Sequence, residues 1–152
     1  MEKRIYLGTD HAGYPLKEEV KAWLIENGFA VSDMGAFELD PEDNYPEFIK
    51  GVAVEIDDDP INRVGIIFGG SGQGEAMVAN RYPNVRAAVL NCNDLSLVPL
   101  CREHNDANVL SIGARFVRES VAIEAVKCFL ETPFSNEERH IRRLNAFNTI
   151  TH

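Results

Sequence analysis

The chain has 152 residues, of which 45% are hydrophobic, and a formal net charge of -9 at pH 7. This length suits one domain with one core, so residues 1–152 are expected to form a single domain. The acidic balance argues against nucleic acid and against an anionic membrane as partners, and no apolar stretch is long enough to cross a bilayer.

Strand and helix patterns alternate along the chain, with no internal repeat and no linker. Runs rich in β-formers predict strands at 4–9, 29–34, 64–68, 86–90 and 109–112. Apolar residues at helical spacing predict helices at 16–27, 46–57, 76–82, 95–103, 120–131 and 135–150. Asp94 is expected to cap the fourth helix, and Ser135 with Glu138 matches a capping box for the last. The alternation predicts an α/β fold in three layers, with a five-stranded parallel sheet and helices on both faces.

The start of the chain and its cysteines indicate a cellular compartment. The first residues are charged and run directly into a strand pattern, which is unlike a signal peptide. Cys92, Cys101 and Cys128 are widely spaced and form no CxxC pair, which argues against a disulfide framework and against a zinc site. We therefore expect a cytoplasmic protein in which the three cysteines are small buried hydrophobic residues.

Polar residues follow several of the predicted strands, at the points where these strands end. In a parallel sheet, ligands bind beyond the carboxyl ends of the strands, near the position where the strand order reverses. Here those ends are 9–11, the glycine loop at 69–75, 91–93 and 113–115. We expect the functional side chains to gather there.

The glycine loop reads Gly-Gly-Ser-Gly-Gln-Gly-Glu from Gly69 to Glu75. It has no lysine, as a P-loop would require, and its spacing differs from the dinucleotide fingerprint G-x-G-x-x-G. A tight strand-to-helix turn without a ligand remains open. The interpretation that fits best is a set of backbone amides that stabilises a developing oxyanion, such as an enediolate, while Glu75 takes a proton.

This loop, the segment from Gly8 to Gly13 and the segment from Arg102 to Leu110 together resemble the ribose-5-phosphate isomerase B family, which includes galactose-6-phosphate and allose-6-phosphate isomerases. The resemblance extends over nearly the whole chain through further short motifs: Tyr45-Pro46, Ala79-Asn80-Arg81, Gly113-Ala114-Arg115 and Arg139-His140. It implies a Rossmann-like fold that interconverts aldose and ketose phosphates through a cis-enediolate without a metal or cofactor. It also implies a homodimer, sometimes paired into a tetramer, whose C-terminal helix reaches into the partner's active site.

The resemblance also indicates which side chain moves the proton. Many family members carry a cysteine base at the end of the third strand, where this chain has Gly69. Another branch lacks that cysteine and uses a glutamate further along the loop, which corresponds to Glu75. The alternative for Glu75 is a carboxylate stabilised by the start of a helix, whose dipole would favour the ionised form that a base requires.

The resemblance implies roles for further residues around the sugar. Ser71 would move a proton between O1 and O2, and the amides of the loop would hold these oxygens; this loop includes Gly70, Gly72 and Gly74. His104 would open the sugar ring, with a share for Asp10, and Asn105 would hydrogen-bond the reacting oxygens. Tyr45 would line the sugar pocket, although Asn44 stands where the family usually has aspartate. Without the resemblance, these residues read as turn, capping or surface positions.

The resemblance implies that His11 and several arginines bind the phosphate. Arg115 would come from one subunit and Arg139 with Arg143 from the other, since the latter two lie i,i+4 on one helix face. His140 is a weaker candidate, and Arg142 is expected to face away. The alternative is a solvated basic turn that follows two glutamates.

The sequence therefore predicts an isomerase of ribose 5-phosphate and ribulose 5-phosphate. Three alternatives stay open: the same chemistry on a six-carbon or four-carbon sugar phosphate, a non-catalytic sugar-phosphate sensor, and a nucleotide-binding module of flavodoxin type.

Overall fold

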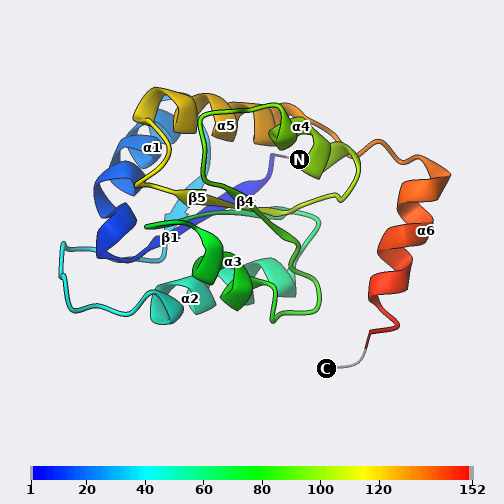
Figure 1. Ribbon diagram of the computed structural model, residues 1–152, viewed down its shortest axis with the longest axis horizontal. Coiled ribbons are helices and arrows are strands. Elements are labelled where there is room, and N and C mark those ends of the chain that lie inside the picture. The colour runs from blue at the N-terminus through cyan, green and yellow to red at the C-terminus, as the bar shows by residue number, and fades with distance from the viewer. Residues whose placement is uncertain (1, 151–152) are drawn as a thin grey trace.

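The computed structural model describes residues 2–150, which form a parallel sheet between two layers of helices (Figure 1). The strand order is β2-β1-β3-β5-β4. The bounds of the strands are β1 Arg4–Thr9, β2 Val31–Asp33, β3 Arg63–Gly69, β4 Ala87–Leu90 and β5 Val109–Gly113. Thr9 pairs with Phe68 and Gly69 pairs with Gly113, so the carboxyl ends of the three central strands meet at one edge. The predicted α/β class and parallel sheet are confirmed.

The helices divide between the two faces of the sheet. α1 (Tyr14–Glu26), α4 (Leu97–Glu103) and α5 (Glu119–Glu131) cover one face, and α2 (Tyr45–Asp58) and α3 (Gln73–Ala79) cover the other (Figure 1). A short 3-10 turn, η1 (His11–Gly13), precedes α1, and α6 (Glu138–Phe147) ends the described chain. Each face has its own apolar cluster, because β3 is buried on both sides and packs against helices above and below.

Several element boundaries differ from the prediction. α3 begins at Gln73 rather than at residue 76, because Gly72 adopts a left-handed φ of 78° and the helix starts directly after it. The predicted cap at Asp94 is wrong: its carboxylate accepts from the Ser96 amide, and α4 begins only at Leu97. β2 has only three residues.

The last helix is shorter than predicted and stands away from the main body. α6 begins at Glu138, and the Ser135 hydroxyl accepts from the Glu137 amide instead of forming the predicted capping box. In Figure 1, α6 lies to one side of the sheet. A cavity of about 390 Å³ separates Phe147, near the end of α6, from the edge strand β4. Phe147 is 50% exposed, so the apolar side of this helix is incompletely covered within one chain.

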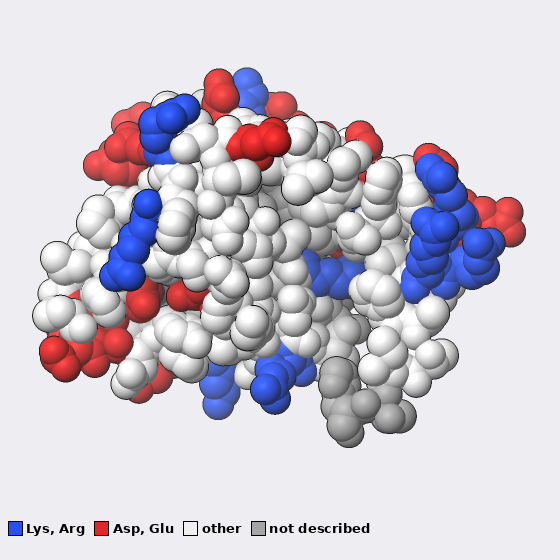
Figure 2. Space-filling model, viewed as in Figure 1, with Lys and Arg blue, Asp and Glu red and all other residues white. Residues whose placement is uncertain are grey.

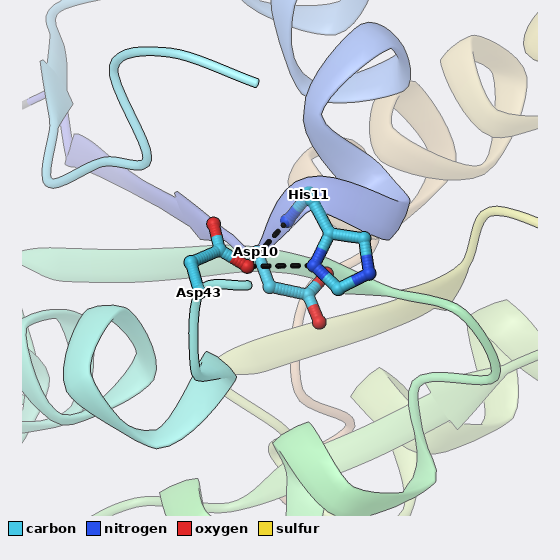
Figure 3. A group of neighbouring side chains, drawn as sticks. All are labelled: Asp10, His11 and Asp43. Carbon is cyan, nitrogen blue, oxygen red and sulfur yellow. Dashed lines mark hydrogen bonds and ion pairs between the residues drawn. The ribbon is translucent and has the colours of Figure 1, made fainter. Parts of the chain in front are cut away.

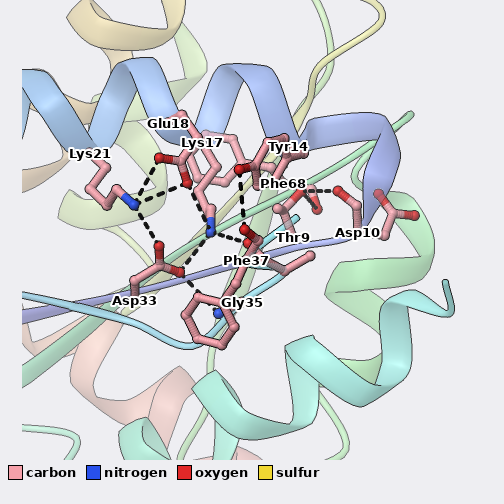
Figure 4. A network of polar contacts seen from close by, with 11 residues as sticks. Thr9, Asp10, Tyr14, Lys17, Glu18, Lys21, Asp33, Gly35, Phe37 and Phe68 are labelled. Carbon is pink, nitrogen blue, oxygen red and sulfur yellow. Dashed lines mark hydrogen bonds and ion pairs between the residues drawn. The ribbon is translucent and has the colours of Figure 1, made fainter. Parts of the chain in front are cut away.

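A buried lysine fastens the segment after β2 to α1 (Figure 4). Lys17 is fully buried, and its ammonium group donates to Asp33 Oδ1 at 2.7 Å and to the Ala36 carbonyl at 2.6 Å. The Ala36 amide in turn donates to the Thr9 carbonyl at 2.8 Å. Lys17 thus holds the segment after β2 against the carboxyl end of β1.

The cysteines differ in burial from the prediction. Cys92 is exposed, because it follows the edge strand β4 in a surface turn, whereas Cys101 and Cys128 are partly buried. All three are unpaired. Within residues 2–150, no helix combines the length and the apolar character that a bilayer span requires.

Candidate active site

An open cavity of about 530 Å³ lies at the carboxyl ends of β1 and β3. The segments that line it come from η1, the start of α2, the glycine loop and the turn after β5. Its lining contains eight of the predicted site residues: Asp10, His11, Tyr45, Gly70, Ser71, Gly74, Glu75 and Arg115. The expectation that polar groups gather at this edge is confirmed.

Backbone hydrogen bonds fasten the glycine loop to the turn after β5. The Ala114 amide donates to the Gly69 carbonyl at 2.8 Å, and the Arg115 amide donates to the Gly70 carbonyl at 3.1 Å. The guanidinium group of Arg115 lies over the loop, so close that a Cβ on Gly70 would lie 3.1 Å from Nη1. The loop therefore carries a cation on its outer side while its backbone is held in place.

Two further side chains rest on this loop. The Tyr45 hydroxyl approaches Gly74, where a Cβ would lie 2.5 Å from the phenolic oxygen. Ser71 Oγ accepts a hydrogen bond from the Gln73 amide at 3.3 Å. The hydroxyl groups of Ser71 and Tyr45 thus lie next to the first residues of α3.

The Glu75 side chain is buried in the first turn of α3, and the residue is only 4% exposed. Burial raises the pKa of its carboxyl group, backbone hydrogen bonds partly oppose the rise, and the nearby Asp10 carboxylate adds to it. The backbone hydrogen bonds at the helix start favour the ionised form, as expected, but desolvation outweighs them and the net shift of the pKa is upward. A carboxyl pKa moved towards neutral pH suits a group that must both accept and return a proton.

The carboxylate of Glu75 fills the space above Gly69. A Cβ built on Gly69 would overlap the carboxylate, with Oε1 as the nearest atom. The end of β3 therefore has room for the glutamate carboxylate or for a side chain at position 69, but not for both in this arrangement. A side chain at position 69, such as the cysteine that the resemblance leads one to look for there, would need the space that the Glu75 carboxylate occupies.

Replacing Gly69 with alanine should displace the Glu75 carboxylate while leaving the fold intact, since the atoms in conflict are at the end of a flexible side chain. If Glu75 is the predicted base, we expect kcat for the predicted isomerisation to fall by about 100-fold. This is the lower end of the range that a general base contributes to a reaction rate. Steady-state kinetics and the midpoint of thermal unfolding measure the two effects.

A matched control is Gly28→Ala, where no atom lies within 4 Å of the added Cβ. It can cost stability because φ is +83°, but it should leave kcat unchanged. An unaltered kcat in Gly69→Ala would contradict the interpretation that the Glu75 carboxylate must lie above Gly69 for the reaction.

Asp10, His11 and Asp43 lie together at the rim of the cavity (Figure 3). His11 Nδ1 lies 2.7 Å from Asp43 Oδ1, and the same oxygen accepts from the His11 amide at 3.0 Å. The hydrogen bond to Asp43 raises the pKa of His11, and the Asp10 carboxylate acts in the same direction. One ligand atom from each residue lies within 4.8 Å of the others, a donor set that could hold a cation. In the present arrangement, Asp43 Oδ1 is already used by His11.

Four predicted site residues lie elsewhere in the chain: His104, Asn105, Arg139 and Arg143. α4 returns from the carboxyl edge of the sheet, so His104 at its end lies at the amino edge, before β5 begins. A strand of five residues spans about 17 Å, which separates this end from the glycine loop. Within one chain, His104 and Asn105 are therefore not brought to Glu75.

These outlying residues form a second polar group around α6. The rings of His104 and His140 lie in contact, with centroids 4.5 Å apart and ring planes tilted by 37°, and the Ser135 amide donates to the Glu103 carbonyl. His140 is buried, and burial with the neighbouring His104 lowers its pKa. Arg139 is exposed and paired with Glu137 at 2.8 Å. Figure 2 shows the basic side chains of α6 gathered at one end of the molecule.

Sequence reasoning missed Asp43. It lies in an acidic stretch of a polar loop, where nothing distinguishes it from Asp40 or Glu42. Its contact with His11 joins positions 32 residues apart and becomes visible only in the folded chain.

Comparison with known proteins shows the family to which the chain belongs. The model of a family described as Ribose/Galactose Isomerase matches residues 5–147. The chain belongs to the ribose/galactose isomerase family. Its members include "Ribose-5-phosphate isomerase B" of Mycolicibacterium paratuberculosis, 40% identical over 142 residues that cover 93% of this chain and 87% of the relative. The protein of the same name from Escherichia coli is 34% identical over 148 residues, 97% of this chain and 96% of the relative.

A solved structure of this family also matches in fold. The ribose-5-phosphate isomerase B of Mycoplasma genitalium, crystallised with bound ribulose 5-phosphate, superposes with a TM-score of 0.92 at 33% identity. The match covers 99% of each chain. The predicted family membership is thus confirmed, and the fold is that of a ribose/galactose isomerase.

Proposed function

We propose that this chain interconverts ribose 5-phosphate and ribulose 5-phosphate through a cis-enediolate, without a metal or cofactor. The observation that carries the proposal is the buried Glu75 carboxylate above Gly69, next to a glycine loop whose residues line the same cavity. The relatives named for this reaction, and the ribulose 5-phosphate bound to the Mycoplasma genitalium enzyme, support the choice of substrate.

In the proposed mechanism, Asp10 and the His104 of a second subunit assist opening of the cyclic aldose. Asn105 likewise comes from the second subunit, because within one chain both residues lie at the opposite edge of the sheet from Glu75. The Glu75 carboxylate takes the proton from C2 and returns it to C1, so the carboxylate is regenerated in each turnover. Ser71 moves a proton between O2 and O1. The amides from Gly70 to Gly74, together with Asn105, stabilise the negative charge on these oxygens.

The phosphate is proposed to bind His11 and Arg115 in the cavity, with Arg139 and Arg143 from a second subunit. Binding of this remote group keeps the reacting carbons aligned with Glu75. Tyr45 lines the sugar site from the start of α2.

A panel of sugar phosphates tests the substrate. Purified protein, with a metal chelator present, should form ribulose 5-phosphate from ribose 5-phosphate faster than it turns over the six-carbon or four-carbon phosphates. Faster turnover of one of those would assign the same chemistry to another sugar. Binding without any turnover would favour a sensor.

We further propose a homodimer, which can pair into a tetramer, with active sites shared across the interface. Two observations support it. His104 and Asn105 lie at the opposite edge of the sheet from Glu75, and α6 presents arginines away from its own cavity. The turn after α4, which carries His104 and Asn105, lies beside α6, since the rings of His104 and His140 are 4.5 Å apart. A second subunit could therefore bring both groups to the glycine loop. The proposed location is the cytoplasm, in agreement with three unpaired cysteines.

Mixing two inactive variants tests the shared site. Glu75→Gln removes the base, and the double substitution Arg139→Ala/Arg143→Ala removes the phosphate clamp, so each protein alone should be nearly inactive. After reversible unfolding and refolding together in equal amounts, random pairing gives about half heterodimers, each with one intact site of two. Activity should return to about a quarter of the wild-type level. If each site is built from one chain, the mixture will stay inactive.

A further inference from the structure

One carboxylate oxygen holds both the backbone and the ring of His11. Asp43 Oδ1 accepts from the His11 amide at 3.0 Å and lies 2.7 Å from Nδ1 of the ring (Figure 3). The Asp43 side chain is 7% exposed, whereas that of His11 is 30% exposed. Two contacts to one buried group fix the position of η1 and the rotation of the imidazole together.

This contact determines which ring nitrogen faces a ligand. A carboxylate can only accept, so Nδ1 carries a proton, and Nε2 points away from Asp43 (Figure 3). His11 lines the cavity, and Asp43 is outside its lining. The imidazole ring therefore lies between the buried Asp43 carboxylate and the cavity.

The remaining charges around the ring come from two other segments. The Asp10 carboxylate favours the protonated imidazole, and the Arg115 guanidinium from the turn after β5 disfavours it. The hydrogen bond that His11 donates to Asp43 has the largest effect and raises the pKa of His11. Within residues 2–150, Asp43 Oδ2 is buried without a hydrogen-bond partner, so His11 is the main group that compensates this carboxylate.

We propose that Asp43 is a positioning residue that holds His11 with Nε2–H directed at the phosphate group of the substrate. The proposal rests on the function proposed above, since it takes the ligand to be a phosphate monoester. It adds a buried carboxylate that acts through His11 and does not touch the substrate. Carboxylate–imidazole pairs act in the same way where histidine must donate from a fixed direction.

The pH dependence of KM for ribose 5-phosphate distinguishes this role from a structural one. Asp43→Asn keeps an oxygen that can accept from the His11 amide but removes the charge that favours protonated His11. At low pH the ring is protonated in both proteins, and their KM values should agree. As pH rises, the variant loses the proton first, and its KM should exceed that of the wild type by about tenfold, the loss of one charge-assisted hydrogen bond. The kcat values should differ much less.

The matched control is Asp40→Asn, which removes the same charge from the same loop. The Asp40 carboxylate is exposed and accepts only from the Glu42 amide, and the hydrogen bond between the Asp43 amide and the Asp40 carbonyl involves the backbone, which the substitution leaves unchanged. The KM ratio to wild type should therefore stay near one at every pH. In a His11→Gln background, Asp43→Asn should have no additional effect on KM, because its influence acts through the ring. A KM ratio for Asp43→Asn that is constant with pH, or full additivity with His11→Gln, would overturn the proposal.

Imidazole NMR of the wild-type protein tests the pairing without relying on turnover or on a variant that must fold. The ¹⁵N shifts of neutral His11 should show the proton on Nδ1, and inorganic phosphate should shift the Nε2 signal. A proton on Nε2 with Nδ1 bare, or no response to phosphate, would contradict the proposal. If both signals are as expected but ribose 5-phosphate is not turned over, the pairing stands and the proposed reaction is wrong.

Discussion

Replacing Glu75 with glutamine is expected to lower kcat for ribose 5-phosphate by about 10³-fold, within the range for loss of a general base. Glutamine has nearly the same shape and can fill the space above Gly69, but it cannot take a proton from C2. In the proposed site His11 and the arginines bind the phosphate and Glu75 does not, so the dissociation constant of ribose 5-phosphate should change little. Steady-state kinetics and isothermal titration calorimetry measure the two quantities.

Two comparisons make this result specific. Glu47→Gln is a matched control, because Glu47 is an exposed carboxylate in the first turn of a helix that also borders the cavity region. It should retain wild-type kcat. If Glu75→Gln retains a near wild-type rate, Glu75 is not the base, although the family assignment would be unaffected.

Replacing Lys17 with methionine is expected to lower the free energy of unfolding by about 3–5 kcal/mol, the usual cost of removing one partner of a buried ion pair. Methionine fills a similar volume but leaves the Asp33 carboxylate and the Ala36 carbonyl without their common donor (Figure 4). Denaturant titration at neutral pH measures the change.

The neighbouring lysine supplies the control for this experiment. Lys21 donates to the other oxygen of the same Asp33 carboxylate at 2.8 Å, but its side chain is 26% exposed. Lys21→Met should therefore cost less than about 1 kcal/mol. If the two variants lose equal free energy of unfolding, the burial of Lys17 does not increase its contribution to stability.

The pH dependence of this loss follows from Asp33. Burial alone would raise the pKa of Asp33, but hydrogen bonds from Lys17 and Lys21 outweigh burial and lower it. A lowered carboxyl pKa stabilises the fold above the ordinary pKa of aspartate, and this contribution disappears as pH falls through the lowered value. The difference in the free energy of unfolding between wild type and Lys17→Met should therefore be largest at neutral pH. It should decrease as the pH falls through the lowered pKa of Asp33.

The sequence was sufficient to predict the sheet, because the strands are short apolar runs separated by amphipathic helices. Central strand β3 is apolar without alternation, and it is buried on both faces as that pattern indicates. The glycine loop and Glu75 could also be identified, since a local motif specifies them. Helix ends were less predictable: Ser135 binds both the Glu137 amide and His140, and this competes with the capping box.

Contacts between distant segments were not predictable from local patterns. Lys17 interrupts the apolar stripe of α1, but lysine is rarely buried, so only the folded chain shows its partners. The pairing of Asp43 with His11 likewise depends on how the loop after β2 returns to the end of β1. The separation of His104 from Glu75 follows from the direction in which α4 runs, and this direction is implied by the predicted topology.

The most direct test of the account is the reaction of the wild-type protein with ribose 5-phosphate in D₂O, with a metal chelator present and the product analysed by NMR. Proton transfer through the Glu75 carboxyl group predicts ribulose 5-phosphate that carries deuterium from the solvent at C1. Because Glu75 can return the same proton within a single turnover, the sugars are followed over many interconversions, during which the carboxyl proton exchanges with solvent. A complete absence of deuterium at C1 after the two sugars have reached equilibrium would indicate direct hydride transfer between the carbons and would contradict the role of Glu75. Failure to form the ketose at all would contradict the proposed reaction.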